Sequence, residues 1–134
     1  MKKKADKKQE YKVLVIDDEP DICSLFKELL GNEGYGVVTA QDGLEGLERY
    51  GESKPDVIIL DLKMPRMGGM ETLRNIRKVD RDVIVIILTA YGSAFTAREA
   101  ADLNVYEYIS KPFNIETVKR VVSEALASER KGEQ

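Results

Sequence analysis

Short apolar runs alternate with amphipathic stretches along most of the chain. The runs are rich in valine and isoleucine and apolar on both sides, which is typical of strands in parallel sheets with helices on both faces. We predict five strands, at Lys12 to Ile16, Gly36 to Ala40, Asp56 to Leu60, Asp82 to Leu88 and Val105 to Ile109.

Between these strands, apolar residues recur at helical spacing. We predict helices from Pro20 to the region of Gly31 to Gly34, from Asp42 to near Gly51, after Gly68 and Gly69, roughly from Ser93 to Leu103, and after Asn114. Pro20 suits an opening turn, and Asp42 and Asn114 are good capping residues. The fourth of these helices is alanine-rich and weakly amphipathic, so its packing should be the loosest.

The alternation of strands and helices predicts an α/β fold, a (βα)5 doubly wound open parallel sheet with right-handed crossovers. Five strands are too few for an eight-stranded barrel. We expect the flavodoxin-like strand order 2-1-3-4-5, in which ligands bind beyond the carboxyl ends of the strands. The expected domain covers residues 11–127, between a basic leader (1–10) and a polar tail (128–134), the two candidate disordered parts.

Polar residues follow four of the predicted strands. Asp17 and Asp18 follow the first strand, Asp61 the third, Thr89 the fourth and Lys111 the fifth. In a parallel sheet these ends share one edge, so we expect the side chains to converge. Two carboxylates about 4 Å apart repel by roughly 4 kcal/mol at an effective dielectric near 20. Such a cluster implies a bound cation, a nearby lysine or raised pKa values.

This set of residues suits phosphoryl chemistry. Oxygen-only ligation favours a hard cation, and Mg²⁺ suits an incomplete set of carboxylates. An aspartate can be the nucleophile toward a phosphoryl group, whose oxygens Mg²⁺, Lys111 and the Thr89 hydroxyl could contact. Each residue alone also has a simpler interpretation: Asp17 and Asp18 as helix caps, Asp61 and Thr89 as turn residues, Lys111 with Pro112 as an extended connection. The combination of all four strand ends favours the phosphoryl site.

Composition narrows the chemistry further. The 134 residues include no histidine and one cysteine, Cys23. Ser-His-Asp and Cys-His sites, His-ligated zinc and CxxC redox motifs are therefore excluded. Cys23 is expected to be a small apolar filler in the first helix. No apolar run approaches the roughly 20 residues of a membrane span, so we expect a cytoplasmic protein without membrane insertion.

Charge is distributed unevenly. Residues 1–10 hold five lysines against Asp6 and Glu10, a net +3, and the whole chain carries −3, so the remainder carries −6. A lysine run can touch nucleic acid or membrane, but without interleaved aromatic residues it is more often a solvated terminus. We therefore expect no direct nucleic-acid binding.

Four segments together resemble the receiver domain of two-component response regulators, including chemotaxis-like and single-domain phosphorelay members. They are VLVIDDEP (13–20), IILDLKMPRMGG (58–69), ILTAYG (87–92) and YISKPF (108–113). The resemblance implies Mg²⁺-dependent transfer of phosphate to Asp61 from a phosphohistidine of a sensor histidine kinase or histidine phosphotransfer protein. The chain would be a signalling phosphoacceptor, catalysing only its own phosphorylation and dephosphorylation, and not an enzyme that turns over a metabolite.

The resemblance also implies a metal site. Asp18, Asp61 and the backbone carbonyl of Lys63 would bind Mg²⁺ directly, with Mn²⁺ as a substitute, and Asp17 would act largely through water. Lys63 and Tyr91, which stand two residues beyond Asp61 and Thr89, are bulky. We expect them to shield the acyl phosphate from water and to lengthen its lifetime.

A switch is implied as well. Thr89 would move toward the phosphoryl group, Lys111 would pair with it, and the aromatic Tyr108 would change rotamer. The Lys111–Pro112 peptide bond would be cis. The fourth helix, fifth strand and fifth helix would form the face that reports the change to a downstream protein, and the pattern also allows phosphorylation-dependent homodimerisation.

Three alternatives remain open. The chain could be the receiver portion of a larger regulator, such as a transcription factor, whose output domain it lacks. A flavodoxin-like cofactor protein would need a Ser/Thr/Gly-rich phosphate loop after the first strand, where Asp17, Asp18 and Glu19 would repel phosphate. A haloacid-dehalogenase-type phosphatase would need a second aspartate two residues after the nucleophile, where Lys63 stands.

One position departs from the family pattern. Asn104 replaces a glycine common in receiver domains but also tolerates a left-handed conformation.

Overall fold

The computed structural model describes residues 11–90, 98–99 and 101–132. Its elements are β1 (Lys12–Ile16), α2 (Pro20–Asn32), β2 (Gly36–Ala40), α3 (Gly43–Ser53), β3 (Val57–Leu60), α4 (Gly69–Val79), β4 (Ile84–Thr89), β5 (Glu107–Ser110) and α6 (Ile115–Gly132). Most of the predicted fourth helix and Tyr91 lie outside the described residues, as does the basic leader. In the described part of the chain, no helix is long and apolar enough to cross a membrane.

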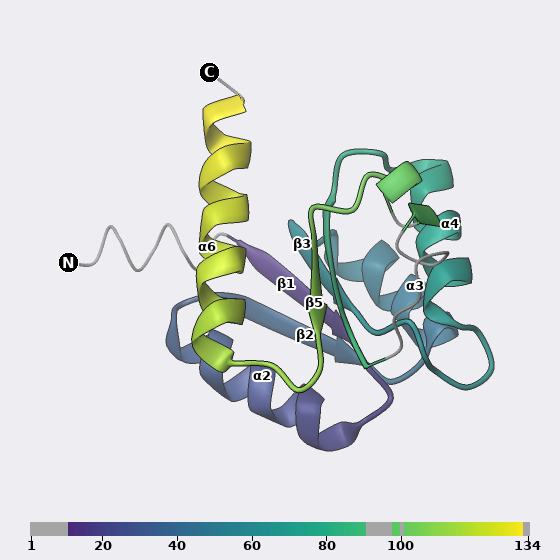
Figure 1. Ribbon diagram of the computed structural model, residues 1–134, viewed down its shortest axis with the longest axis horizontal. Helices are drawn as coiled ribbons and strands as arrows, with labels where there is room; N and C mark the ends of the chain where they lie inside the picture. The colour runs from purple at the N-terminus through teal and green to yellow at the C-terminus, as the bar shows by residue number, and fades with distance from the viewer. Residues whose placement is uncertain (1–10, 91–97, 100, 133–134) are drawn as a thin grey trace.

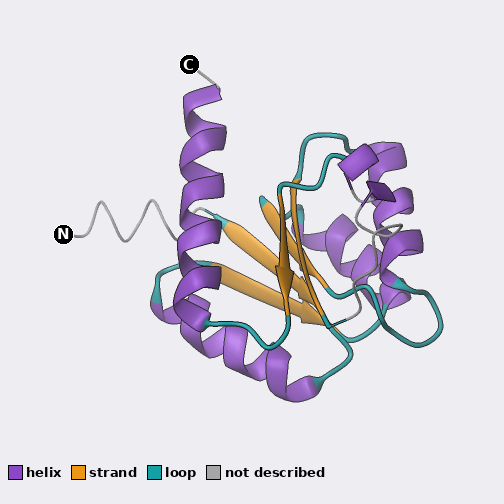
Figure 2. Cartoon of the chain, in the orientation of Figure 1, coloured by secondary structure: helices purple, strands orange, loops and turns teal. Residues whose placement is uncertain are grey.

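The described strands form one five-stranded sheet in the order β2-β1-β3-β4-β5, and every neighbouring pair is parallel. The predicted strand order is therefore confirmed. Helices α2 and α6 lie on one side of the sheet, and α3 and α4 lie on the other (Figures 1 and 2). The order reverses between β1 and β3, which places the switch point of the sheet there.

Each central strand divides its side chains between two apolar layers. Val13 and Val15 of β1 belong to the layer that also contains Phe26 of α2 and Val122 of α6. Leu14 and Ile16 of β1 belong to the opposite layer, with apolar residues of α4. Because successive strand residues point to opposite faces, continuously apolar strands require a helix layer on each side.

Capping residues set two helix starts as predicted. The Asp42 carboxylate accepts a 2.8 Å hydrogen bond from the Glu45 amide, and Asn114 accepts one of 2.8 Å from the Glu116 amide. Cys23 is buried in α2, as expected of a small filler.

Several predicted boundaries are shifted. Asp80 accepts hydrogen bonds from the amides of Asp82 and Val83, and this turn delays β4 to Ile84. β3 likewise begins one residue later than predicted, at Val57, and Thr89 is the last residue of β4 instead of following it.

The start of the last strand and the end of the last helix both lie further along the chain than predicted. Asn104 has a φ of 63°, and this left-handed turn moves the start of β5 to Glu107. α6 continues to Gly132, past the boundary predicted at residue 127. The residues from Ser128 to Lys131 include good helix formers and no proline, so the helix continues through them.

A buried arginine ties α4 to the chain that enters β5. The Arg77 guanidinium donates hydrogen bonds to the carbonyl oxygens of Leu103 (2.8 Å), Asn104 (3.1 Å) and Asp80 (3.1 Å). Arg77 as a whole is only 3% exposed. Burial lowers the pKa of this guanidinium from its usual value. Arg77 therefore satisfies three backbone carbonyls at the edge of the sheet where the strands begin.

We expect Arg77→Met to lower the free energy of unfolding by about 3 kcal/mol, since it leaves several partly buried carbonyls without a donor. Chemical denaturation measures the effect. Arg74→Met is the matched control, because Arg74 lies on the same helix, is 45% exposed and pairs with Glu99. That change should cost under about 1 kcal/mol. Equal losses in the two variants would contradict the role of Arg77.

Candidate functional site

The sheet itself positions the polar residues at its carboxyl edge. The amide of Asp17 donates to Ala40 O (3.0 Å), that of Asp61 to Ile16 O (2.9 Å), and that of Lys111 to Thr89 O (3.0 Å). These bonds extend the backbone ladder one step beyond β1, β3 and β5. The side chains after three strands are therefore held at fixed positions around the switch point.

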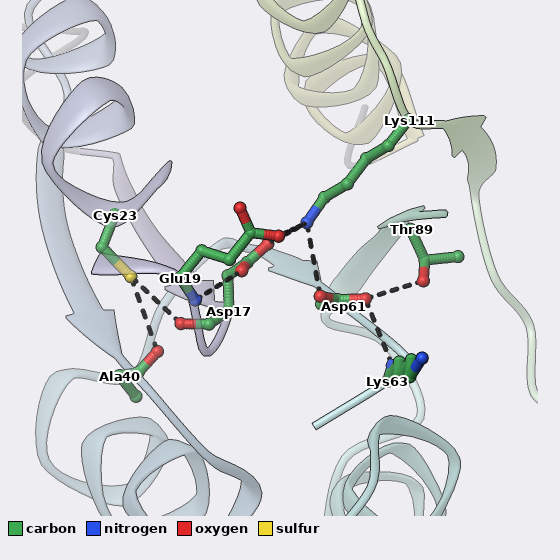
Figure 3. A network of polar contacts seen from close by, with 8 residues as sticks. All are labelled: Asp17, Glu19, Cys23, Ala40, Asp61, Lys63, Thr89 and Lys111. Carbon is green, nitrogen blue, oxygen red and sulfur yellow. Dashed lines mark hydrogen bonds and ion pairs between the residues drawn. The ribbon is translucent and has the colours of Figure 1, made fainter. Parts of the chain in front are cut away.

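The Lys111 ammonium lies at the centre of this edge (Figure 3). Its Nζ is 2.8 Å from Asp17 Oδ2, 3.3 Å from Asp61 Oδ2 and 3.3 Å from Glu19 Oε2. The Lys111–Pro112 peptide is cis, as predicted. The lysine thus connects carboxylates that follow two different strands.

Both carboxylate oxygens of Asp61 accept hydrogen bonds. Oδ1 accepts from Thr89 Oγ1 at 2.7 Å and from the Lys63 amide at 3.2 Å, while Oδ2 faces Lys111. Asp61 is 5% exposed. Its orientation is therefore fixed from two sides, by the hydroxyl at the end of β4 and by the lysine after β5 (Figure 3).

An open cavity of about 320 Å³ lies over these groups. The residues that line it are Asp18, Glu19, Asp61, Lys63, Thr89, Ala90 and Lys111. Asp17 is not among them; it is buried and paired with Lys111. The cavity therefore gives a small solute access to Asp61, Thr89 and Lys111 together.

Negative charge exceeds positive charge around Lys111. Burial raises the pKa of Asp17 above its usual value, and the hydrogen bond from Lys111 offsets part of that rise. Burial alone would lower the pKa of Lys111, but its hydrogen bond to Asp17 and the charges of Asp17 and Asp61 raise it instead. Lys111 is therefore a permanent cation at neutral pH.

The donor set fits a hard divalent cation. Asp17, Asp18 and Glu19 each place a carboxylate oxygen within 4.8 Å of the others. With Asp61, the site holds four carboxylates and one ammonium, a formal charge of −3 when all are ionised, and three of the carboxylates contact the ammonium. Oxygen ligands with this excess of negative charge suit Mg²⁺ or Mn²⁺. Asp18 and Asp61 both line the cavity, whereas Asp61 is not part of the three-residue cluster.

The loop between β3 and α4 is closed tightly against Asp61. Gly69 donates its amide to Leu62 O at 3.0 Å, and a Cβ on Gly69 would lie 2.3 Å from the backbone oxygen of Asp61. Only glycine fits this close approach. Arg66, at the tip of the loop, forms an ion pair with Asp42 at the start of α3. The loop therefore keeps the Lys63 peptide beside the Asp61 carboxylate.

Two predicted site residues remain, Tyr108 and Tyr91, and Tyr108 is not among the residues that line the cavity. Tyr108 lies in β5 and packs, partly buried, against the apolar layer on the side of α3 and α4. Burial raises the pKa of its hydroxyl. Tyr91 lies outside the described residues.

Two cavity residues were not predicted from the sequence. Glu19 faces Lys111 and lines the cavity, and its position directly after Asp17 and Asp18 was the available signal. Ala90 also lines the cavity, and nothing in an alanine after a strand indicates a site.

Comparisons with known proteins agree with this arrangement. The family model described as "Response regulator receiver domain" matches residues 13–123. Sporulation initiation phosphotransferase F of Bacillus subtilis is 35% identical over 115 residues, which are 86% of this chain and 93% of that protein. Transcriptional regulatory protein ZraR of Klebsiella oxytoca is 36% identical over 125 residues, which are 93% of this chain but only 28% of that protein.

Solved structures show the same fold. A CheY-like receiver domain protein from Methanospirillum hungatei superimposes with a TM-score of 0.88 at 28% identity, over 91% of this chain and 98% of that one. The response regulator TrrA of Thermotoga maritima, solved in complex with Mg²⁺ and BeF, gives a TM-score of 0.76 at 38% identity, over 85% and 97% of the two chains. On its sequence, its strand order and its match to the family model, the chain belongs to the receiver domain family of two-component response regulators.

Proposed function

We propose that this receiver accepts a phosphoryl group on Asp61 in a Mg²⁺-dependent reaction and relays a signal by changing its protein-binding surface. The observation that carries the proposal is the position of the Asp61 carboxylate. It lies in an open cavity and is contacted at once by Lys111 Nζ and Thr89 Oγ1. A neutral hydroxyl and a fixed cation on the same carboxylate suit an acyl phosphate, whose oxygens need both kinds of donor.

The proposed step is a displacement at phosphorus. An Asp61 carboxylate oxygen forms the new O–P bond while the P–N bond of a phosphohistidine breaks. The bonding electron pair stays on the imidazole nitrogen, which takes a proton from solvent. With acetyl phosphate as donor, the O–P bond of the donor breaks instead and acetate leaves.

Lys111 and Thr89 stabilise the transferred group in this proposal. Lys111 neutralises charge on one phosphoryl oxygen, and the Thr89 hydroxyl donates to another. Both already contact Asp61 before any phosphoryl group is present. Catalysis of phosphoryl transfer consists largely of such positioning and charge neutralisation.

Asp18, Asp61 and the Lys63 backbone carbonyl are the proposed ligands of Mg²⁺, for which Mn²⁺ could substitute, with Asp17 acting through water. When bound, the cation would neutralise charge on the phosphoryl oxygens. The acidic cluster and the position of Asp18, Asp61 and Lys63 in the lining of one cavity support this assignment. Lys63 and Tyr91 are proposed to restrict the approach of water to the acyl phosphate, and the Lys63 side chain is exposed at the cavity.

The proposed donors are a sensor histidine kinase or a histidine phosphotransfer protein, on the basis of the family to which the chain belongs. The chain itself has no histidine that could carry the phosphoryl group. Phosphorylation would act on Thr89 and Tyr108, and the face formed by residues 93–103, β5 and α6 would bind a downstream protein or a second copy. The proposed compartment is the cytoplasm, which suits a chain whose one cysteine is a free, buried thiol.

A second candidate is the receiver portion of a longer regulator. The transcriptional regulatory relatives favour it, since the chain spans 28% of one and 26% of another. The phosphoacceptor chemistry is the same in both cases, and only the output differs.

Incubation with Mg²⁺ and acetyl phosphate tests the proposal. We expect phosphate to be incorporated and then released by hydroxylamine, which cleaves acyl phosphates but leaves serine and threonine phosphates intact. Chelation of the divalent ion should prevent incorporation. A hydroxylamine-stable product, or incorporation that is indifferent to chelation, would contradict the proposed chemistry.

Mg²⁺ should also stabilise the fold, because it relieves repulsion among the carboxylates. The expected gain is about 2.7 kcal/mol when free Mg²⁺ is 100-fold above its Kd. Thermal unfolding with Mg²⁺, against NaCl at equal ionic strength, measures it. Asp18→Asn should lose most of the gain, whereas a gain of the same size in that variant would rule out Asp18 as a ligand.

A further inference from the structure

The ammonium of Lys111 has three hydrogens, and three carboxylates take them. Asp17, Glu19 and Asp61 each have an oxygen within 3.3 Å of Nζ. An ammonium has no further donor to offer. A phosphoryl oxygen that arrives at Asp61 therefore competes with these carboxylates for the hydrogens of Lys111.

The three carboxylates differ in how easily they can leave. The side chains of Asp17 and Asp61 are 3% and 6% exposed, while that of Glu19 is 59% exposed. A buried carboxylate that loses its cation remains in a poorly solvated place, which is costly. An exposed one is hydrated by water as it leaves, and such a pair is weak. Glu19 is therefore the partner that Lys111 releases most easily.

The backbone of Glu19 forms hydrogen bonds at the start of α2, but its side chain takes no part in capping the helix. Its amide donates to Asp17 Oδ1 at 2.9 Å, and its carbonyl accepts from the amides of Ile22 and Cys23 in the first turn of α2. The side chain forms no capping hydrogen bond. A substitution at this position that keeps the backbone therefore leaves the start of the helix intact.

We propose that Glu19 is a displaceable counter-ion, which occupies Lys111 in the unphosphorylated protein and yields its place to a phosphoryl oxygen. Glu19 is thus a positioning residue that acts through Lys111, and it lowers the affinity of the cavity for small anions. The inference rests on the proposed function, because the phosphoryl group that displaces Glu19 is the one accepted by Asp61.

The alternative role of Glu19 predicts the opposite effect. Its carboxylate also lies within 4.8 Å of those of Asp17 and Asp18, where it could help to hold a cation. Neutralising a cation ligand would weaken Mg²⁺ binding and, with it, the binding of a phosphoryl group. Neutralising a competitor for Lys111 would strengthen anion binding at saturating Mg²⁺. The sign of the change therefore separates the two roles.

The test is a titration of beryllofluoride, a phosphoryl analogue, into the full chain at saturating Mg²⁺, with Mg²⁺ affinity measured separately. We expect Glu19→Gln to bind the analogue about two- to fivefold more tightly than wild type, the range that an exposed ion pair supplies. Asp21→Asn is the matched control, since it removes the same charge from the first turn of α2. It should change the affinity by less than twofold.

Each outcome has one interpretation. Unchanged affinity in Glu19→Gln, with normal binding to wild type, would overturn the inference and leave the proposed function standing. Weaker analogue binding together with weaker Mg²⁺ binding would make Glu19 a cation ligand instead and would also overturn it. An equal gain in analogue affinity in Asp21→Asn would show that any lost negative charge near the cavity has the same effect, and would also overturn the inference. Failure of wild type to bind the analogue at all would count against the proposed function itself.

Discussion

Asp61→Asn should abolish formation of the acyl phosphate. The asparagine amide is nearly isosteric with the carboxylate, and its oxygen can still accept from Thr89 and the Lys63 amide, but it is not a nucleophile toward phosphorus. Incorporation of phosphate from acetyl phosphate in the presence of Mg²⁺ measures the effect. We expect no hydroxylamine-labile phosphate above background, with a folded protein by thermal unfolding.

Asp56→Asn provides the control for this substitution. Asp56 precedes β3, at the end of the strand opposite Asp61, and accepts a hydrogen bond from the Lys12 amide. Its replacement should leave phosphorylation unchanged. Undiminished labelling in Asp61→Asn would show that another residue accepts the phosphoryl group.

Lys111→Met should slow phosphoryl transfer by about 10²–10³-fold, the loss that follows removal of one preorganised charge-stabilising donor. The rate of labelling at saturating Mg²⁺ measures it. Without Mg²⁺, the same substitution should lower the free energy of unfolding by about 3 kcal/mol, because two buried carboxylates lose their cation. Mg²⁺ should restore part of that loss, since it supplies positive charge to the same carboxylates.

The pH dependence of this destabilisation has a definite sign. The pKa of Lys111 is raised in the folded protein, so its contribution to stability is fully present below the usual lysine pKa of about 10.4. The difference between wild type and Lys111→Met should be present at neutral pH and should shrink as the pH rises into the alkaline range in which Lys111 loses its proton. Lys119→Met is a suitable control, because Lys119, on α6, forms longer ion pairs of 3.5 Å with Glu33 and Glu116. Similar rates in Lys111→Met and wild type would contradict the role of Lys111.

Much of the fold was predictable because one physical requirement repeats along the chain. Apolar runs such as Val83 to Leu88, in the predicted fourth strand, are apolar on both sides and can be covered only by helices on both faces. The alternation of strands and helices then leaves few arrangements of a parallel sheet. The same logic placed Asp17, Asp61 and Lys111 at one edge, since each directly follows a strand.

Other features depend on contacts that a linear pattern does not contain. Glu19 reaches Lys111 across the switch point, 92 positions along the chain. In the sequence Arg77 resembles an exposed polar residue of α4, yet it is buried and donates hydrogen bonds to backbone carbonyls of residues that precede β5. The late starts of β4 and β5 depend on the Asp80 turn and on the left-handed Asn104. Such side chain to backbone contacts are formed by tertiary structure and not by local propensity.

The most direct test of the central claim locates the phosphoryl group itself. Borohydride reduces an aspartyl phosphate to homoserine, and peptide mass spectrometry identifies the converted position. After incubation with Mg²⁺ and acetyl phosphate, we predict homoserine at position 61, and none there when the phosphodonor is omitted. Conversion at Asp17 or Asp18, with aspartate retained at position 61, would contradict the account.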